Sequence, residues 1–142
     1  MNNPPDSEAC ERTPIRVLYG DTDSGGVVYY ANYLRYFEAG RTEFMRTRVI
    51  SYRELEARGL VLPVVESHAR YKASAVYDDL LTVETTLTEL RNISCRFDHR
   101  IIRATDGKLL VKGYTVHAVI DRTGKLVRFP ADLLDGLRGF VR

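Results

Sequence analysis

The sequence places two carboxylates in one short loop, Asp21 and Asp23, followed closely by Gly25 and Gly26. In residues 32–44, which come next, apolar side chains recur every three or four positions with charged ones between them, as in an amphipathic helix. The first turn of a helix has unpaired N–H groups and a partial positive charge, so it can polarise a carbonyl oxygen placed against it. The pattern predicts a site where Asp23 attacks such a carbonyl or delivers water to it.

The same loop has simpler interpretations. An Asp-x-Asp sequence before a helix commonly forms a turn and caps the helix, which needs no ligand. A metal site is disfavoured because no Glu, His or further Asp follows at the spacing of an EF-hand loop, so we expect no metal. Gly25 and Gly26 allow positive φ values and leave room for a ligand to approach the backbone. We therefore expect Asp21 and the two glycines to support the loop.

The elements that would position this loop follow in order along the chain. Alternating residues predict a first strand over 13–19, and the amphipathic helix after the loop extends to about Arg46. Ser51 and Glu54 have the spacing of a capping box for a short second helix that stops at Gly59. Segments rich in Val, Thr, Ile and Tyr predict strands at 62–73, 80–90, 94–103 and 108–120, then a short segment at 126–129 and a final helix at 131–137.

This order of elements predicts an α+β fold. Consecutive strands pair as antiparallel neighbours, and the resulting sheet of about five strands must cover one apolar face. The long helix carries the bulky aromatics Tyr33, Tyr36, Phe37 and Phe44, so the sheet should curl around it in the hotdog arrangement. The uncovered sheet face and the edge strands then favour an oligomer.

The chain as a whole has the features of one domain in a cytoplasmic protein. Its 142 residues are enough for a single core, with a flexible polar tail expected at 1–13 and the domain at 14–142. The N-terminus lacks a signal-peptide pattern, and the two cysteines have no partner at metal-ligand spacing, so we expect free thiols. With a net charge of +2 and no apolar run that could span a bilayer, we expect no nucleic-acid partner and no membrane insertion.

Two segments resemble a known family. Residues 21–43, DTDSGGVVYYANYLRYFEAGRTE, closely resemble the signature of the 4-hydroxybenzoyl-CoA thioesterase family of hotdog proteins, including its branch of acyl-CoA thioesterases associated with the Tol-Pal system. Residues 71–81, YKASAVYDDLL, resemble the strand-turn-strand segment of that family. The resemblance covers nearly all of the chain except the tail. It implies an acyl-CoA thioesterase without metal or other cofactor, acting as a homodimer or homotetramer with sites at subunit interfaces.

By position, the resemblance implies a role for each site residue. Asp23 matches the catalytic carboxylate, as nucleophile or general base, and Asp21 matches its structural neighbour. Tyr30 matches the residue whose backbone N–H contacts the thioester carbonyl. The Tol-Pal branch usually has histidine there, so this position is closer to the hydroxybenzoyl type, and the acyl group stays open between aryl and short or medium alkyl. Arg91 and Ser94 match residues that bind the CoA nucleotide.

Two alternatives concern the helix. Asn32 could be its N-cap, which would leave Tyr30 outside the helix, so that its N–H would not be an end-of-helix donor. Glu38 is a second candidate carboxylate, since another hotdog branch uses a helix glutamate. An ion pair between Glu38 and Arg35 or Arg41 is the simpler interpretation.

The histidines separate the competing functions. His68, His99 and His117 fall in predicted strands, far apart, and are expected to be satisfied strand residues. A hotdog hydratase or dehydratase needs a histidine near the helix, and residues 21–43 contain none. A non-catalytic acyl-CoA-binding module, in which Asp23 only caps the helix, is the third possibility.

Overall fold

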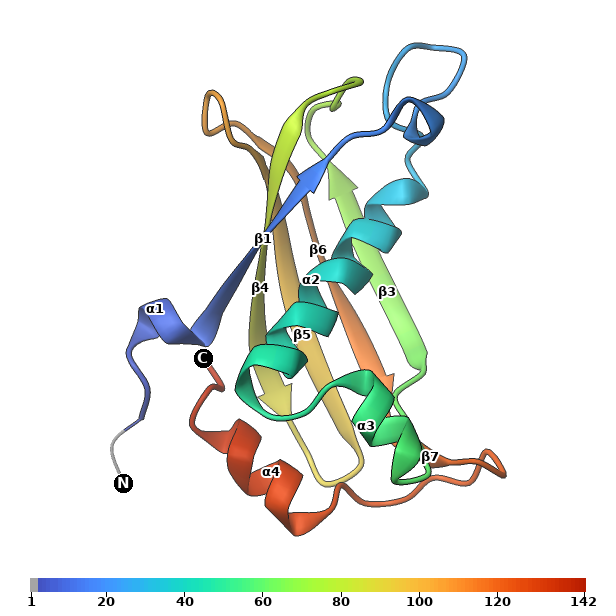
Figure 1. Ribbon diagram of the computed structural model, residues 1–142, viewed down its shortest axis with the longest axis vertical. Coiled ribbons are helices and arrows are strands. Elements are labelled where there is room, and N and C mark those ends of the chain that lie inside the picture. The colour runs from blue at the N-terminus through green and yellow to red at the C-terminus, as the bar shows by residue number, and fades with distance from the viewer. Residues whose placement is uncertain (1–2) are drawn as a thin grey trace.

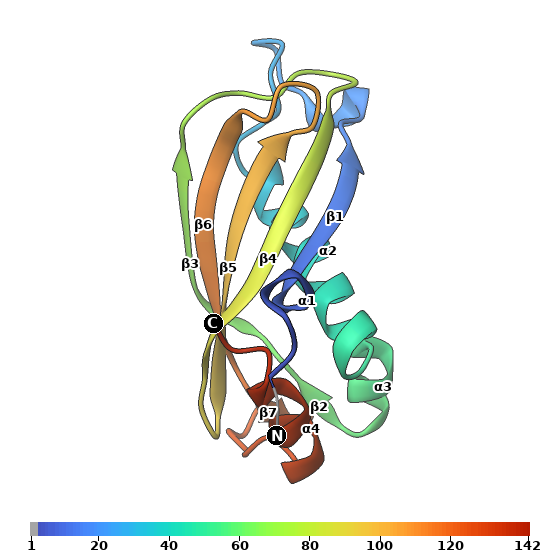
Figure 2. The same cartoon turned by 90° about the vertical axis from the view of Figure 1, so that its left-hand side faces the viewer.

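The computed structural model of the protein describes residues 3–142. Its main elements are β1 (Cys10–Arg16), α2 (Asn32–Arg48), β3 (Val64–Tyr71), β4 (Leu80–Leu90), β5 (Ser94–Arg103) and β6 (Leu109–Ala118). The strands form one antiparallel sheet in the order β1-β4-β5-β6-β3, and this sheet curls around α2 (Figure 1). Figure 2 shows that α2 lies on one face of the sheet. The α+β hotdog fold expected from the sequence is confirmed.

Shorter elements complete the chain. Helix α1 (Asp6–Ala9) precedes β1, and a 3-10 turn, η1 (Tyr19–Asp21), follows it. Helix α3 (Tyr52–Ala57) begins after Ser51, whose hydroxyl accepts from the Glu54 N–H at 3.2 Å, so the predicted cap is confirmed. The remaining elements are β2 (Leu60–Val61), which pairs with β7 (Ile120–Asp121), and α4 (Ala131–Arg138).

The N-terminal segment is more ordered than the sequence predicted. The structure places α1 and the start of β1, at Cys10, inside the predicted tail, so a tail through residue 13 is wrong for the described residues. Strand β1 pairs with β4 along its whole length. Arg48 of α2 also holds this segment, donating to Glu8 O at 2.8 Å and to the Glu11 carboxylate at 2.7 Å. The first residues of this edge strand are mostly polar, so the sequence pattern did not predict a strand there. Residues 1 and 2 lie outside the described part.

Other boundaries differ by a few residues. β1 stops at Arg16 instead of residue 19, because the chain turns into η1. The predicted strand 62–73 is shorter, and β6 ends at Ala118, with β7 continuing separately. In the segment 126–129, Leu126 forms only an isolated bridge to Ile120. These differences lie at the ends of elements, where turn geometry competes with the strand pattern.

Helix α2 lies directly on the sheet because glycines remove the side chains that would separate them. A Cβ atom at Gly40 would meet Thr85 Oγ1 and would lie 2.8 Å from Val83 Cγ1, both on β4. On β6, a Cβ atom at Gly113 would lie 2.9 Å from the ring of Phe37. Phe37 therefore packs into the space that Gly113 leaves open, and the position of α2 is set by close contact.

A buried polar seam lies between two apolar clusters beneath α2. One cluster includes Phe37, and the other includes Phe44 and Phe97 and extends to α3 and α4. His99 contacts both clusters, because its ring is stacked on Phe37 with centroids 4.5 Å apart and lies 6.5 Å from Phe97. The core is thus divided at the middle of the helix.

Hydrogen bonds run through this seam in one direction. Leu62 O can only accept, so His117 Nδ1 donates to it at 3.1 Å, and His117 Nε2 accepts from Thr115 at 2.9 Å. Thr115 Oγ1 accepts in turn from His99 Nε2 at 3.4 Å, and His99 Nδ1 accepts from Thr85 at 3.1 Å. Burial lowers the pKa of His99 to about 3 and that of His117 to about 4, so both are neutral. The prediction of satisfied strand histidines is confirmed for this pair.

Candidate active site

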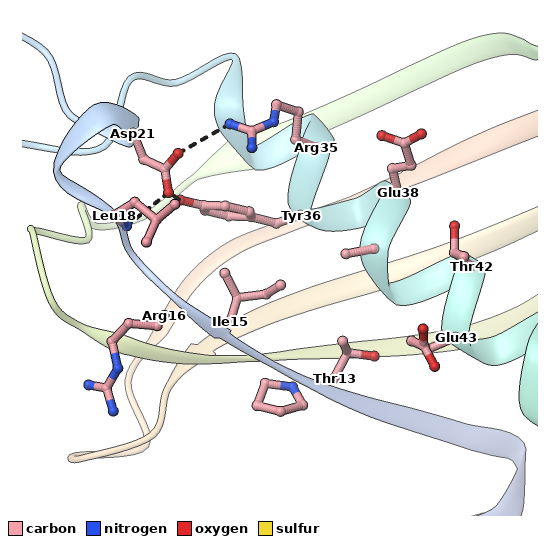
Figure 3. A pocket seen from close by; sticks show the side chains of 12 residues that line it. Thr13, Ile15, Arg16, Leu18, Asp21, Arg35, Tyr36, Glu38, Thr42 and Glu43 are labelled. Carbon is pink, nitrogen blue, oxygen red and sulfur yellow. Dashed lines mark hydrogen bonds and ion pairs between the residues drawn. The ribbon is translucent and has the colours of Figure 1, made fainter.

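Asp21 is enclosed by the end of β1 and the first turns of α2. Its side chain, only 7% exposed, accepts three hydrogen bonds. The donors are the Leu18 N–H at 3.0 Å, the Tyr36 hydroxyl at 2.9 Å and the Arg35 guanidinium at 3.1 Å (Figure 3). The carboxylate therefore joins the loop to the helix.

These donors determine the charge of Asp21. Burial by itself raises the pKa of a carboxyl group, but the bonds from Leu18, Tyr36 and Arg35 outweigh burial, so the pKa of Asp21 lies below its usual value. Burial, followed by the hydrogen bond to Asp21, raises the pKa of Tyr36, so its hydroxyl keeps its proton and donates. Asp21 is thus an ionised carboxylate engaged by the protein itself.

Asp23, two residues later, is exposed. Its Oδ1 accepts from the Gly25 N–H at 2.8 Å, and its backbone exchanges bonds with Val27 O and the Gly26 N–H at 2.9 and 3.0 Å. Gly26 has a φ of +80°, which favours glycine, and a Cβ atom at Gly25 would crowd Asp23 Oδ1 at 3.1 Å. The two glycines therefore let this tight loop close around Asp23 while leaving its carboxylate exposed.

The two acids line different cavities. Asp23 and Tyr30 share one of about 290 Å³, whose other walls include Tyr33 and residues 71–74 at the end of β3. Asp21 lines a separate cavity of about 520 Å³ between β1 and α2, which Figure 3 shows. A single loop therefore gives one carboxylate to each side of α2.

Helix α2 begins in a way that leaves backbone donors free. Its N-cap is Ala31, without a side-chain cap, and the first helical residue, Asn32, instead donates through Nδ2 to Asp21 O at 2.8 Å. Asn32 is therefore not the N-cap, but Tyr30 still lies outside the helix, because it precedes the cap residue Ala31. In residues 3–142, the N–H groups of Tyr30 and Ala31 have no hydrogen-bond acceptor. These two groups are available to an oxygen atom at the helix start.

Tyrosine side chains form the wall of the Asp23 cavity. The rings of Tyr30 and Tyr33 both contact that of Tyr71, with centroids 6.1 and 5.7 Å apart. Tyr33 is buried and accepts the Ala75 N–H through its hydroxyl at 3.1 Å, whereas Tyr30 and Tyr71 are exposed. The cavity therefore has one fixed aromatic surface and two exposed ones.

Glu38 does not share the Asp23 cavity. It lines the cavity that contains Asp21 and two others along α2. The ion pair expected from the sequence is absent in the described chain, because Arg35 binds Asp21 and Arg41 makes no ion pair. The structure brings Asp23 and Tyr30 together and leaves Glu38 apart.

Arg91 lies in the turn between β4 and β5 and Ser94 begins β5, and the Arg91 N–H donates to Ser94 O at 2.8 Å. Arg91 is exposed and Ser94 is half-buried. This turn is at the far end of β4 from the Asp23 loop (Figure 1), roughly 35 Å away for a strand of this length. Within one chain, these residues and Asp23 therefore belong to separate places.

The remaining polar groups add no second site to the described part of the chain. His68 is exposed and stacks on Tyr114 on the outer face of the sheet, with centroids 5.3 Å apart. Among residues 3–142, no three His, Cys, Asp or Glu side chains form a group that could hold a metal ion. Cys10 and Cys95 are free, as expected. No helix in this part is long and apolar enough to cross a membrane.

Sequence reasoning missed the role of Tyr36. Its position in the helix pattern assigned it to the core, and it is indeed 3% exposed. The available signal was the hydroxyl group, which needs a partner when it is buried. Tyr71 was likewise read as part of a strand, and only its position at the end of β3 brings it to the cavity.

Comparisons with known proteins show which family this chain resembles. A family model described as the thioesterase-like superfamily matches residues 17–137. The acyl-CoA thioesterase YbgC of Haemophilus influenzae is 39% identical over 123 residues, which cover 84% of this chain and 88% of the relative. The 4-hydroxybenzoyl-CoA thioesterase of Pseudomonas sp. (strain CBS-3) is 31% identical over 129 residues, covering 84% and 92%. The crystal structure of hypothetical protein TT1821 from Thermus thermophilus has a TM-score of 0.86 and 34% identity, covering 90% and 97%.

A curled antiparallel sheet around one central helix defines the hotdog fold, and the TT1821 structure shares this fold. Because the family model spans most of the sequence, the chain belongs to the thioesterase-like superfamily. It is an enzyme of the thioester hydrolase class. The resemblance stated from residues 21–43 and 71–81 is confirmed by the named relatives.

Proposed function

We propose that this protein hydrolyses an acyl-CoA thioester to the free acid and CoA. The observation that carries the proposal is that Asp23 and Tyr30 line one cavity, and that the Tyr30 N–H has no acceptor in residues 3–142. A thioester oxygen at the start of α2 would accept from this N–H, with the carbonyl carbon toward Asp23. The relatives named acyl-CoA thioesterase YbgC and 4-hydroxybenzoyl-CoA thioesterase support this substrate class.

The chemistry needs only these groups, because a thioester is already activated. Its sulfur donates little electron density to the carbonyl group, so the carbonyl carbon is readily attacked. As a nucleophile, Asp23 forms a bond to the carbonyl carbon, the C–S bond breaks, and CoA leaves as a thiolate that takes a proton. Water then hydrolyses the mixed anhydride and restores the carboxylate. As a general base, Asp23 instead takes a proton from the water that attacks the carbonyl; the C–S bond then breaks, and the CoA thiolate takes up that proton. In both routes the oxyanion forms beside the Tyr30 N–H.

The cavity walls suit a compact acyl group. Tyr30, Tyr33 and Tyr71 offer aromatic surfaces that pack against an aryl ring or a short to medium alkyl chain. A second protomer would complete the walls. Strand β3 is an unpaired edge of the sheet, and Val64, Val65 and Tyr71 on it are exposed.

We therefore propose a homodimer, which could pair into a homotetramer, with each site at a subunit interface. The position of Arg91 and Ser94 supports this proposal, because they lie at the other end of the sheet from Asp23 in one chain and would reach CoA only from another. Light scattering on the purified protein tests it, and a stable, active monomer would contradict it.

The experiment that tests the function is a panel of aryl, short-chain and medium-chain acyl-CoA substrates with a thiol reagent that detects free CoA. We expect CoA release from at least one substrate and a preference for one acyl class. Tight binding without release would favour the acyl-CoA-binding module. Hydration of an unsaturated acyl-CoA without release would favour the hydratase, although no histidine lines the Asp23 cavity in the described chain.

A further inference from the structure

The backbone around Asp21 connects the two groups that the proposed reaction uses. Asp21 is separated from Asp23 by one residue, and its carbonyl oxygen accepts from the Tyr29 N–H at 2.9 Å, immediately before Tyr30. The same oxygen accepts from Asn32 Nδ2 at 2.8 Å. Asp21 O thus ties the start of the acidic loop to the residues that carry the free N–H groups.

The Asp21 side chain connects the start of the acidic loop to the first turns of α2. Its Oδ2 accepts from the Tyr36 hydroxyl at 2.9 Å, and its Oδ1 accepts from Arg35 at 3.1 Å. Tyr36 is buried, whereas the Arg35 side chain is 62% exposed, so solvent weakens the Arg35 contribution. Tyr36 is therefore the rigid member of the pair, held in place by its edge-on contact with Tyr33, with ring centroids 5.8 Å apart.

We propose that Tyr36, Asn32 and Asp21 act together as positioning residues, a clamp that sets the Asp23 carboxylate relative to the Tyr30 N–H. This inference rests on the proposed function, because it concerns the same two groups. None of the three lines the Asp23 cavity, so the clamp acts through the backbone and touches no substrate. A thioester must meet the carboxylate and the N–H at once, and a misplacement of about 1 Å can cost up to about a hundredfold in rate.

The clamp has a kinetic signature that a purely structural role lacks. Substrate binding depends on the tyrosine walls and on the CoA contacts, which a looser clamp leaves in place. Loss of a clamp bond should therefore lower kcat and leave KM nearly unchanged. A bond that only stabilises the fold would instead lower the melting temperature and leave kcat unchanged at temperatures where the protein is folded.

The test is Tyr36→Phe, which removes one hydroxyl and keeps the ring. We expect kcat for the best acyl-CoA substrate to fall about tenfold or more, with KM within about twofold of wild type. The matched control is Tyr52→Phe on α3, because the Tyr52 hydroxyl is also buried but has no hydrogen-bond partner in the described chain. This control should keep the wild-type kcat. Equal kcat values for wild type and Tyr36→Phe would overturn the clamp.

A second variant covers the case in which Tyr36→Phe does not fold. Asn32→Ala removes the side-chain bond to Asp21 O, at a half-buried position, and should also lower kcat without raising KM. A wild-type kcat for Asn32→Ala in that case would overturn the clamp. Asp23→Asn distinguishes a failure of the proposed catalytic role from a failure of the clamp. Full activity of Asp23→Asn would refute the proposed catalytic role, whereas an inactive Asp23→Asn beside a fully active Tyr36→Phe would refute the clamp alone.

Discussion

Asp21 and Asp23 are two residues apart in the chain but line cavities on different sides of helix α2. Asp21 is buried and engaged by Leu18, Tyr36 and Arg35, whereas Asp23 is exposed and its carboxylate accepts from the Gly25 N–H of the same loop. The physical reason is the turn η1, which directs the first carboxylate inward before the loop turns outward. One short motif thereby supplies a buried, anchoring acid and an exposed acid.

Replacing the exposed acid should separate catalysis from stability. Asp23→Asn should lower kcat by at least about a hundredfold on the best acyl-CoA substrate, because the amide can neither attack nor accept a proton. Its melting temperature should stay near that of wild type, because the side chain is exposed. Steady-state CoA release and thermal unfolding measure the two properties. An active Asp23→Asn enzyme would rule out Asp23 as the catalytic group.

Glu38→Gln tests the other candidate carboxylate. Because Glu38 lines cavities away from Asp23, we expect its kcat to stay within about twofold of wild type. The same CoA-release assay measures it. A loss comparable to that of Asp23→Asn would show that another protomer brings Glu38 to the reacting carbonyl.

Replacing the buried acid should lower the stability of the fold. Asp21→Ala leaves the Leu18 N–H and the Tyr36 hydroxyl without their acceptor, so the free energy of unfolding should fall by about 1 to 3 kcal/mol. Asp23→Ala, at an exposed position, should change it by only about 0.5 kcal/mol. Urea denaturation at neutral pH compares the two. Equal losses of stability in the two variants would contradict the structural role of Asp21 that distinguishes it from Asp23.

Two helical glycines make a matched pair for packing. Gly40→Ala should destabilise the protein by about 1 to 3 kcal/mol, because the new methyl group would press on Thr85 and Val83. In α4, a Cβ atom at Gly136 would lie 3.4 Å from the nearest Val49 atom, an ordinary contact. Gly136→Ala should therefore stabilise the protein by up to about 1 kcal/mol through helix propensity. Chemical denaturation of both variants gives the comparison, and stabilisation by Gly40→Ala would contradict the close contact of helix and sheet.

The buried histidine seam should make stability depend on pH. The unfolded imidazoles bind a proton below about pH 6.5, whereas burial keeps folded His99 neutral to about pH 3 and folded His117 neutral to about pH 4. The unfolded state therefore binds more protons over this range, and the free energy of unfolding should fall as the pH drops from about 6.5. Each unit of pKa difference corresponds to about 1.4 kcal/mol.

Urea denaturation between pH 7.5 and 5 measures this slope, at pH values above the titration of the paired carboxylates. His99→Asn should reduce the slope, even if its stability is lower throughout. A slope that does not respond to His99→Asn would exclude His99 as a source of it.

The sequence alone predicted the long helix, the central strands and the acidic loop that precedes the helix. The 3.6-residue period of the aromatics in α2, the bounds of β4 and β5 and the cap at Ser51 are local patterns, and local patterns survive folding. The two glycines beside Asp23 likewise indicated a tight loop before the structure gave Gly26 its positive φ.

The tertiary structure decided which polar groups meet. Three outcomes depend on side chains between 3 and 15 positions apart that compete for one partner. These are the inward direction of Asp21, the role of Asn32 at the helix start, and the choice of Arg35 between Glu38 and Asp21. Helical spacing allowed Arg35 to pair with Glu38, but the buried Asp21 carboxylate attracts the guanidinium more strongly, because it lies in a less polar environment. Spacing along a chain cannot rank such competitors, since their energies depend on burial, and burial exists only once the sheet has closed around α2.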